Sequence, residues 1–225
     1  MILINSYLIV NNTSDPTVRL LLRFNTDYTD SSVVNATVTN SGCTISSSTF
    51  KFGAGSLYTG AAGTAFLQTP ASTNYSLGTS DFTIEFWIYF PSFVNTTSIL
   101  GNTNAPAGSF GIGGWHFHTN NNRINFRYNL TGANVFLSGM FGSSLNWIHV
   151  AVVRNATTIS IFGQGTLVDT KTLLLTDSLG TGSTDTVFVP NAFTSFPRAE
   201  FYMDDFRITK AARYKESYSL PTSPF

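Results

Sequence analysis

A strict period of two constrains the fold of this chain more than any other feature. In the segment DFTIEFWIYF, every second residue from Phe82 to Phe90 is Phe or Ile, whereas Thr, Glu, Trp and Tyr occupy the positions between. Successive side chains of a β-strand point to opposite faces, so this pattern predicts a strand with one face in a core. The segment WIHVAVVR, residues 147–154, alternates in the same way.

The rest of the chain supports an all-β fold. Further strand-like runs, bounded by Gly, Asn and Ser turns, are VRLLLRF (18–24), RINFRYN (123–129) and TISIFG (158–163). Only KAARYKES, residues 210–217, favours a helical turn or two. Many short strands with turns between them predict a two-sheet antiparallel sandwich.

Length and charge limit the domain count and the partners. A chain of 225 residues fits one sandwich domain. Twelve Lys and Arg residues balance twelve Asp and Glu residues, and no basic cluster stands uncompensated, so we expect no nucleic-acid partner. The N-terminal MILINSYLIV lacks basic residues and is too short for a signal peptide, and no apolar run has transmembrane length. We therefore expect synthesis and folding in a cytoplasm, without a membrane partner.

Several segments occur in an order typical of one family. They are KFGAGSLYTG (51–60), LGTSDFTIEFWIYF (77–90), WIHVAVVRNATTISIFGQG (147–165), MDDFRITKAARY (203–214) and LPTSPF (220–225). From about Val18 to Phe225, the chain resembles the concanavalin A-like, laminin-G-type jelly-roll domains of bacteriophage virion structural proteins. The resemblance implies a two-sheet antiparallel jelly roll, the concanavalin A-like lectin/glucanase fold, over residues 18–225, preceded by an arm over residues 1–17.

The same resemblance implies a non-enzymatic role on the virion surface, most often as a capsid decoration or cement protein. Its expected partners are other virion proteins, such as the major capsid protein or neck and tail proteins, and a homo-oligomer is an option. The apolar arm is suited to lying against a neighbour or adding a strand to its sheet. The arm residues that we expect to bind a partner are Ile2, Leu3, Ile4 and Tyr7.

The alternative is a tail or capsid fibre adhesin that acts as a carbohydrate-binding module for host-surface glycans. Its candidate residues are Trp87, Tyr89, Trp115 and Trp147, because aromatic rings stack on sugar faces. The same rings could instead pack under loops or at a subunit contact.

Three carboxylates in EFYMDDFRITKAARY raise the question of catalysis. On one strand Glu200 and Asp204 lie about 13 Å apart, too wide for a glycosidase acid pair. A cross-strand pair of Glu85 with Asp205 stays open. Asp204 has the parity of Phe206, so we expect it on the core side as a structural acid that accepts backbone amides. We predict no enzymatic activity.

Metal sites are the remaining option, and no other cofactor is expected. Related laminin-G-type sandwiches often hold calcium at the loop rim, and the acids available as its ligands here are Asp27 and Asp30. Alternatively, Asp30 caps a turn through side-chain hydrogen bonds. His116 and His118 have the spacing of two zinc ligands on one strand face, with His149 on a different strand as the third candidate.

Overall fold

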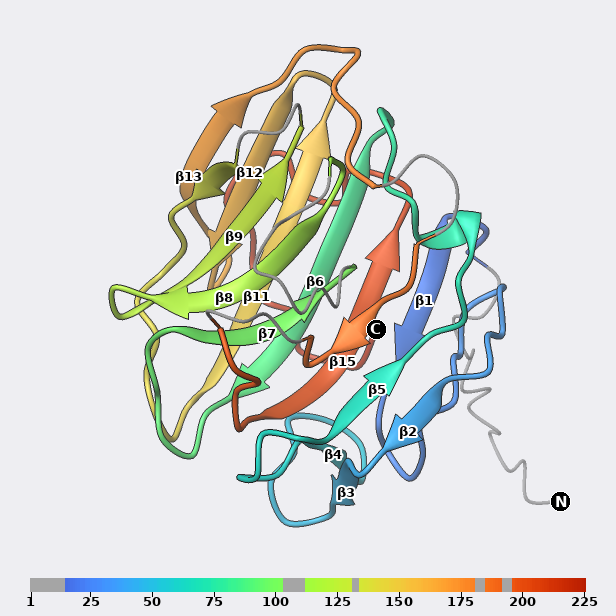
Figure 1. The fold of residues 1–225 in the computed structure, drawn as a ribbon, viewed down its shortest axis with the longest axis vertical. Coiled ribbons are helices and arrows are strands. Elements are labelled where there is room, and N and C mark those ends of the chain that lie inside the picture. The colour runs from blue at the N-terminus through green and yellow to red at the C-terminus, as the bar shows by residue number, and fades with distance from the viewer. Residues whose placement is uncertain (1–14, 103–111, 131–133, 181–184, 192–195) are drawn as a thin grey trace, which may run out of the picture.

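The computed structural model describes residues 15–102, 112–130, 134–180, 185–191 and 196–225. It is an all-β sandwich of two antiparallel sheets, which confirms the predicted fold class. In Figure 1 the seven-stranded sheet lies toward the viewer and the eight-stranded sheet lies behind it. The helical turn η1 (Thr73–Tyr75) is short, and within the described ranges no helix has the length and hydrophobicity to cross a bilayer.

The eight-stranded sheet is built around the two longest alternating segments. Its strands in spatial order are β13 (Thr166–Thr172), β12 (Thr158–Gly163), β11 (Trp147–Asn155), β6 (Phe82–Tyr89), β15 (Tyr202–Thr209), β4 (Ser56–Tyr58) and β3 (Thr44–Ser46). Strand β1 (Val18–Leu22) pairs with β15 as well. The predicted strands at 81–90, 147–154 and 158–163 are therefore confirmed as β6, β11 and β12.

The seven-stranded sheet faces it across the core. Its strands in spatial order are β10 (Asn134–Leu137), β9 (Arg123–Asn129), β8 (Trp115–Asn120), β7 (Thr97–Gly101), β14 (Phe188–Val189), β5 (Phe66–Gln68) and β2 (Thr39–Ser41). Phe86 of β6 meets Phe117 of β8 edge to face between the sheets, with ring centroids 5.0 Å apart. The Phe and Ile positions of β6 thus form the inner face, as their period predicts.

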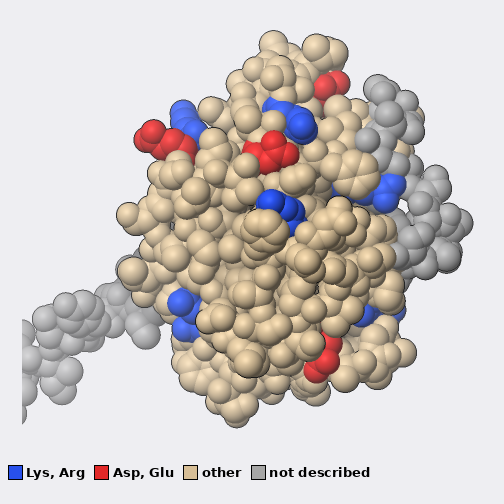
Figure 2. Space-filling model, turned by 90° about the vertical axis from the view of Figure 1, so that its left-hand side faces the viewer, with Lys and Arg blue, Asp and Glu red and all other residues tan. Residues whose placement is uncertain are grey.

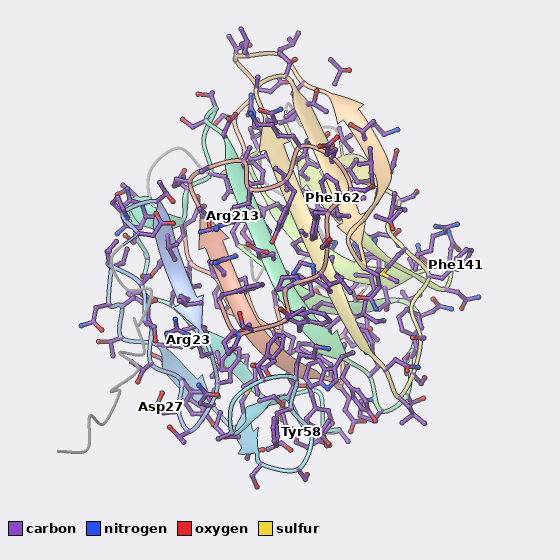
Figure 3. All side chains as sticks on the ribbon, turned by 180° about the vertical axis from the view of Figure 1, so that it is seen from behind. Arg23, Asp27, Tyr58, Phe141, Phe162 and Arg213 are labelled. Carbon is purple, nitrogen blue, oxygen red and sulfur yellow. The ribbon has the colours of Figure 1, made fainter. Side chains whose placement is uncertain are left out.

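The outer face of the eight-stranded sheet is covered by residues 210–225, which follow β15 and which we call the covering segment. Residues 210–217 are not helical, so the predicted helical turn is wrong. The segment instead crosses the sheet in an extended form (Figure 3). Two backbone amides fix it to the sheet: the amide of Arg213 donates to the hydroxyl of Thr83 on β6, and the amide of Tyr218 donates to the carbonyl of Gly165 between β12 and β13.

A buried ion pair lies beneath this covering segment. Arg207 of β15 donates two hydrogen bonds to one oxygen of Glu85 on β6, at 3.0 and 2.7 Å. The hydroxyl of Tyr214, from the covering segment, donates to the other oxygen at 2.7 Å. Burial opposes the ionisation of Glu85, but His149, Arg207 and Tyr214 outweigh it and hold the pKa of that carboxyl below its ordinary value.

Replacing Glu85 with Ala should destabilise the fold by about 3–5 kcal/mol, because Arg207 is then left buried without its counter-charge. The free energy of unfolding, measured by urea denaturation, tests this value. Glu216→Ala removes an exposed carboxylate from the same covering segment and is the matched control. A loss with Glu85→Ala no larger than with Glu216→Ala would contradict this role of the ion pair.

Candidate functional site

Four aromatic side chains form a row across the outer face of the eight-stranded sheet. Tyr58 of β4 lies directly opposite Tyr202 of β15, and Tyr202 lies opposite Tyr89 of β6. Tyr89 in turn lies opposite Trp147 of β11. Side chains directly opposite on neighbouring strands share a face and touch, so the four rings make one continuous strip. We call these four residues the aromatic row.

The rings of the aromatic row contact one another in sequence. Tyr58 and Tyr202 are stacked, with centroids 4.6 Å apart and planes at 21°. Tyr202 and Tyr89 meet edge to face, with ring centroids 5.7 Å apart. The rings of Tyr89 and Trp147 are tilted relative to each other, and their centroids are also 5.7 Å apart. All four side chains are partly exposed. Each ring is held by its neighbours and still presents surface to solvent.

One carboxylate lies at the Tyr58 end of the row. The hydroxyl of Tyr58 donates to Glu200 at 2.6 Å. This hydrogen bond, together with burial and the carboxylate charge, raises the pKa of Tyr58 to about 12, so the hydroxyl stays protonated. Tyr58 lies at the lower end of the outer face in Figure 3. A strip of aromatic surface beside a hydrogen-bond acceptor suits a ligand with apolar faces and hydroxyl groups.

Two of the four predicted glycan-binding residues are not part of this surface. Trp87 lies on the outer face but is only 1% exposed, because Phe52 and His149 pack against its ring and Lys51 lies over it at 4.2 Å. Trp115 is fully buried on the inner face of the seven-stranded sheet, beside Phe126. The prediction that these two tryptophans bind glycan is wrong, since neither can reach a ligand.

The row contains two residues that sequence reasoning missed. Tyr89 and Trp147 were predicted from their outward parity on β6 and β11, and both are in the row. Tyr58 and Tyr202 come from segments far apart in the chain and join only through strand pairing. The one sequence signal for Tyr202 was its position among aromatic residues in the segment EFYMDDF.

Asp204 and Asp205 lie at a β-bulge. The backbone of Asp205 has a φ of 47°, and the pairing of β15 with β6 shifts by one residue between Asp204 and Arg207. Asp204 therefore lies opposite Trp87 on the outer face, and the expected core-side placement is wrong. Its carboxylate is nevertheless a buried acceptor, which receives the amides of Lys51 and Phe52 at 2.8 and 2.9 Å.

The same bulge decides which residue of β15 lies opposite Glu85. Arg207, and not Asp205, lies opposite Glu85. The carboxylate of Asp205 instead accepts the amide of Phe225 at 3.1 Å, under the covering segment. Glu85 and Asp205 are both buried and both engaged by the protein itself.

The candidate calcium ligands differ in their surroundings. Asp30 is buried, and its two oxygens accept hydrogen bonds from the amides of Leu21, Ser32 and Ala36 and the hydroxyl of Ser32. The Asp30 carboxylate therefore fixes the loop after β1. Because both of its oxygens already accept hydrogen bonds inside the protein, Asp30 is a structural acceptor and not the predicted calcium ligand. Asp27 is exposed and lines an open polar depression with Arg23, Asn25 and Ser31.

The histidines do not converge. His116 and His118 lie on β8 in the seven-stranded sheet, whereas His149 lies on β11 in the eight-stranded sheet. The three-histidine zinc hypothesis is therefore wrong. Across the described residues, no group of three His, Cys, Asp or Glu side chains has the geometry to hold a metal ion.

Residues 59–217, more than half of the chain, match the family described as the concanavalin A-like lectin/glucanases superfamily. The chain therefore belongs to this superfamily, which confirms that part of the resemblance. No curated protein sequence matches the chain.

Several solved structures with the same fold are toxin binding domains. The binding domain of Paraclostridial Mosquitocidal Protein 1 has a TM-score of 0.70 at 15% identity, covering 88% of this chain and 50% of that one. The binding domain of botulinum neurotoxin DC in complex with SialylT has a TM-score of 0.65 at 16% identity, covering 88% and 49%. The same domain in complex with rat synaptotagmin II has a TM-score of 0.66 at 17% identity, covering 91% and 50%. This chain thus spans about half the length of these structures, and the likeness shows the fold alone.

The bulge carboxylates predict an unusual pH dependence. Burial raises the pKa of Asp204 to about 6, and burial with the charge of Asp204 raises the pKa of Asp205 to about 7. Both groups bind a proton more tightly in the folded chain, so their stabilising contribution is complete at low pH and is lost as the pH rises through these values. The free energy of unfolding should therefore fall more steeply between about pH 4, the ordinary value of both groups, and about pH 7 than it does in Asp205→Asn.

Urea denaturation of both proteins across this pH range measures the difference. The amide of Asn can still accept the hydrogen bond from Phe225, so the variant keeps the contact and loses only the titration. Asp27→Asn at an exposed site is the control. An equally steep fall in Asp205→Asn and in the unmodified chain would contradict the assignment.

Proposed function

We propose that the chain is a non-catalytic carbohydrate-binding module and that its glycan lies across the aromatic row. The observation that carries this proposal is the register of four partly exposed rings on four adjacent strands. Neighbouring strands lie about 4.8 Å apart, so the row is about 14 Å long. That length accommodates a short run of linked sugar rings, each of which can place its apolar face on an aromatic ring.

The chemistry at the row favours a neutral glycan. Glu200 supplies an acceptor for sugar hydroxyls next to Tyr58. Its negative charge disfavours sugars that carry carboxylate or sulfate groups at that end. The ligand class that fits best is therefore a linear neutral oligosaccharide.

Membership of the superfamily and the similar structures support a binding role. The similar structures are named as binding domains, and one of them is in complex with SialylT. A role without catalysis is supported by Glu85, Asp204 and Asp205, all buried and engaged with protein groups.

A virion location, with capsid decoration as the main role or a fibre as the alternative, stays a prediction from the family resemblance. The similar structures are toxin binding domains, and they favour the glycan-binding hypothesis. The predicted arm residues Ile2, Leu3, Ile4 and Tyr7 lie outside the described residues. Calcium binding likewise stays a prediction.

A glycan array probed with the unmodified chain and with Tyr202→Ala tests the proposal. Tyr202 contacts two other rings of the row, so its loss should weaken binding of neutral glycans by about tenfold or more, the effect of about 1.4 kcal/mol. Leu175→Ala removes an exposed apolar side chain outside the row and should leave binding unchanged. The proposal fails if no neutral glycan is bound, or if Tyr202→Ala binds as well as the Leu175→Ala control.

A further inference from the structure

A second exposed surface lies on the opposite side of the sandwich, where two arginines pair with two phenylalanines. Arg127 of β9 lies opposite Phe136 of β10, with its guanidinium 5.2 Å from the ring centroid. Arg123 of β9 forms a bridge with Phe141, with its guanidinium 3.9 Å from that ring. Arg123 and Arg127 share the outer face of the seven-stranded sheet, because they are an even number of residues apart. We call these four residues the arginine–phenylalanine face.

The two rings are unusually exposed for phenylalanine. Phe136 is 47% exposed and Phe141 is 63% exposed. In each pair the guanidinium lies over the ring, and the exposed fraction shows that the remaining ring surface meets solvent. Phe141 lies at the right-hand edge of the molecule in Figure 3. Exposed aromatic surface beside polar groups is typical of binding sites.

The positive charge of this face comes from the two arginines. On the same face, burial and the charge of Arg127 lower the pKa of His118 to about 3, so this histidine is neutral near pH 7. Arg123 donates one hydrogen bond to the carbonyl of Gly139, a neutral partner. Asp169 on β13 accepts the amides of Ser138 and Thr170 with its two oxygens. Figure 2 views the side on which Phe141 lies and shows few charged side chains there.

The spacing of the two arginines limits the ligand. Four residues along a strand separate their backbones by about 13 Å. Each guanidinium lies over a different phenylalanine ring, which keeps the two cations apart. A ligand that uses both must carry anionic groups at intervals, joined by units that can lie on the phenylalanine rings.

We propose that the arginine–phenylalanine face binds a linear acidic polysaccharide, a sugar chain that carries carboxylate or sulfate groups at intervals. Arg123 and Arg127 each pair with one anionic group, which suits the planar donor geometry of guanidinium. Phe136 and Phe141 contact the sugar rings between those groups. The proposal does not rest on the aromatic row, which lies on the other sheet and favours neutral glycans.

The observations favour a polysaccharide over a nucleic acid. Nucleic-acid affinity comes mainly from neutralising many phosphates, and two arginines on a chain with no net charge supply little of that effect. A single-stranded DNA of equal charge therefore serves as the competing ligand in the test.

Isothermal titration with a heparin hexasaccharide as the probe tests the proposal. The unmodified chain should bind it, and binding should weaken as sodium chloride rises from about 0.05 to about 0.2 M, because salt screens exposed charges. Arg123→Gln and Arg127→Gln should each weaken binding by about tenfold, the effect of losing a charge-assisted hydrogen bond. Phe141→Ala should also weaken binding, and it leaves the hydrogen bond of Arg123 to Gly139 in place.

Controls separate this face from other effects. Lys171→Gln removes an exposed cation on β13 and should change the affinity less than about twofold. Tyr202→Ala should leave hexasaccharide binding unchanged, so a failure of the aromatic row is distinguishable from a failure of this face. Thermal melts of all variants check that the fold is retained.

Three results would overturn the proposal. The first is no binding of the heparin hexasaccharide by the unmodified chain. The second is full binding by a folded variant that carries both Arg123→Gln and Arg127→Gln. The third is DNA of equal charge that binds as tightly as the hexasaccharide.

Discussion

The ion pair between Glu85 and Arg207 joins the two central strands of the eight-stranded sheet, β6 and β15, on their outer face. Buried charges are costly unless they are paired and hydrogen-bonded, so the covering segment can exclude water here because Glu85 and Arg207 neutralise each other and Tyr214 donates to the second oxygen. The segment in turn is held by the sheet, through Thr83 and Gly165. Each part therefore depends on the other.

This arrangement divides the outer face of β6 into a covered and an open part. Glu85 and Trp87 lie under the covering chain, whereas Tyr89, at the end of the same strand, is partly exposed. The aromatic row starts where the cover ends, so its rings rest on a rigid sheet and still face solvent. A site on a strand scaffold needs little ordering when a ligand binds, which favours affinity.

The sequence predicts the strands well because their inner faces repeat Phe and Ile with period two. The sequence predicts the aromatic row less well. Alternation along a strand shows which side chains point away from the core, but it does not show whether other parts of the chain cover them. Trp87 and Tyr89 share that outward parity, and Trp87 is buried because His149 and the distant residues Phe52 and Lys51 pack against its ring. Trp115 could have been assigned to the core from its parity with Phe117. The bulge at Asp205 left no sequence signal, and it reversed the expected face of Asp204.

The chain has three tryptophans, and only Trp147 belongs to the aromatic row. Their indole N–H groups give three separate signals in a ¹H–¹⁵N NMR spectrum. During titration with the neutral oligosaccharide that the glycan array selects, we expect the Trp147 signal to shift, whereas the signals of buried Trp87 and Trp115 stay in place. An unmoved Trp147 signal in the presence of bound oligosaccharide would show that the glycan does not lie on the aromatic row.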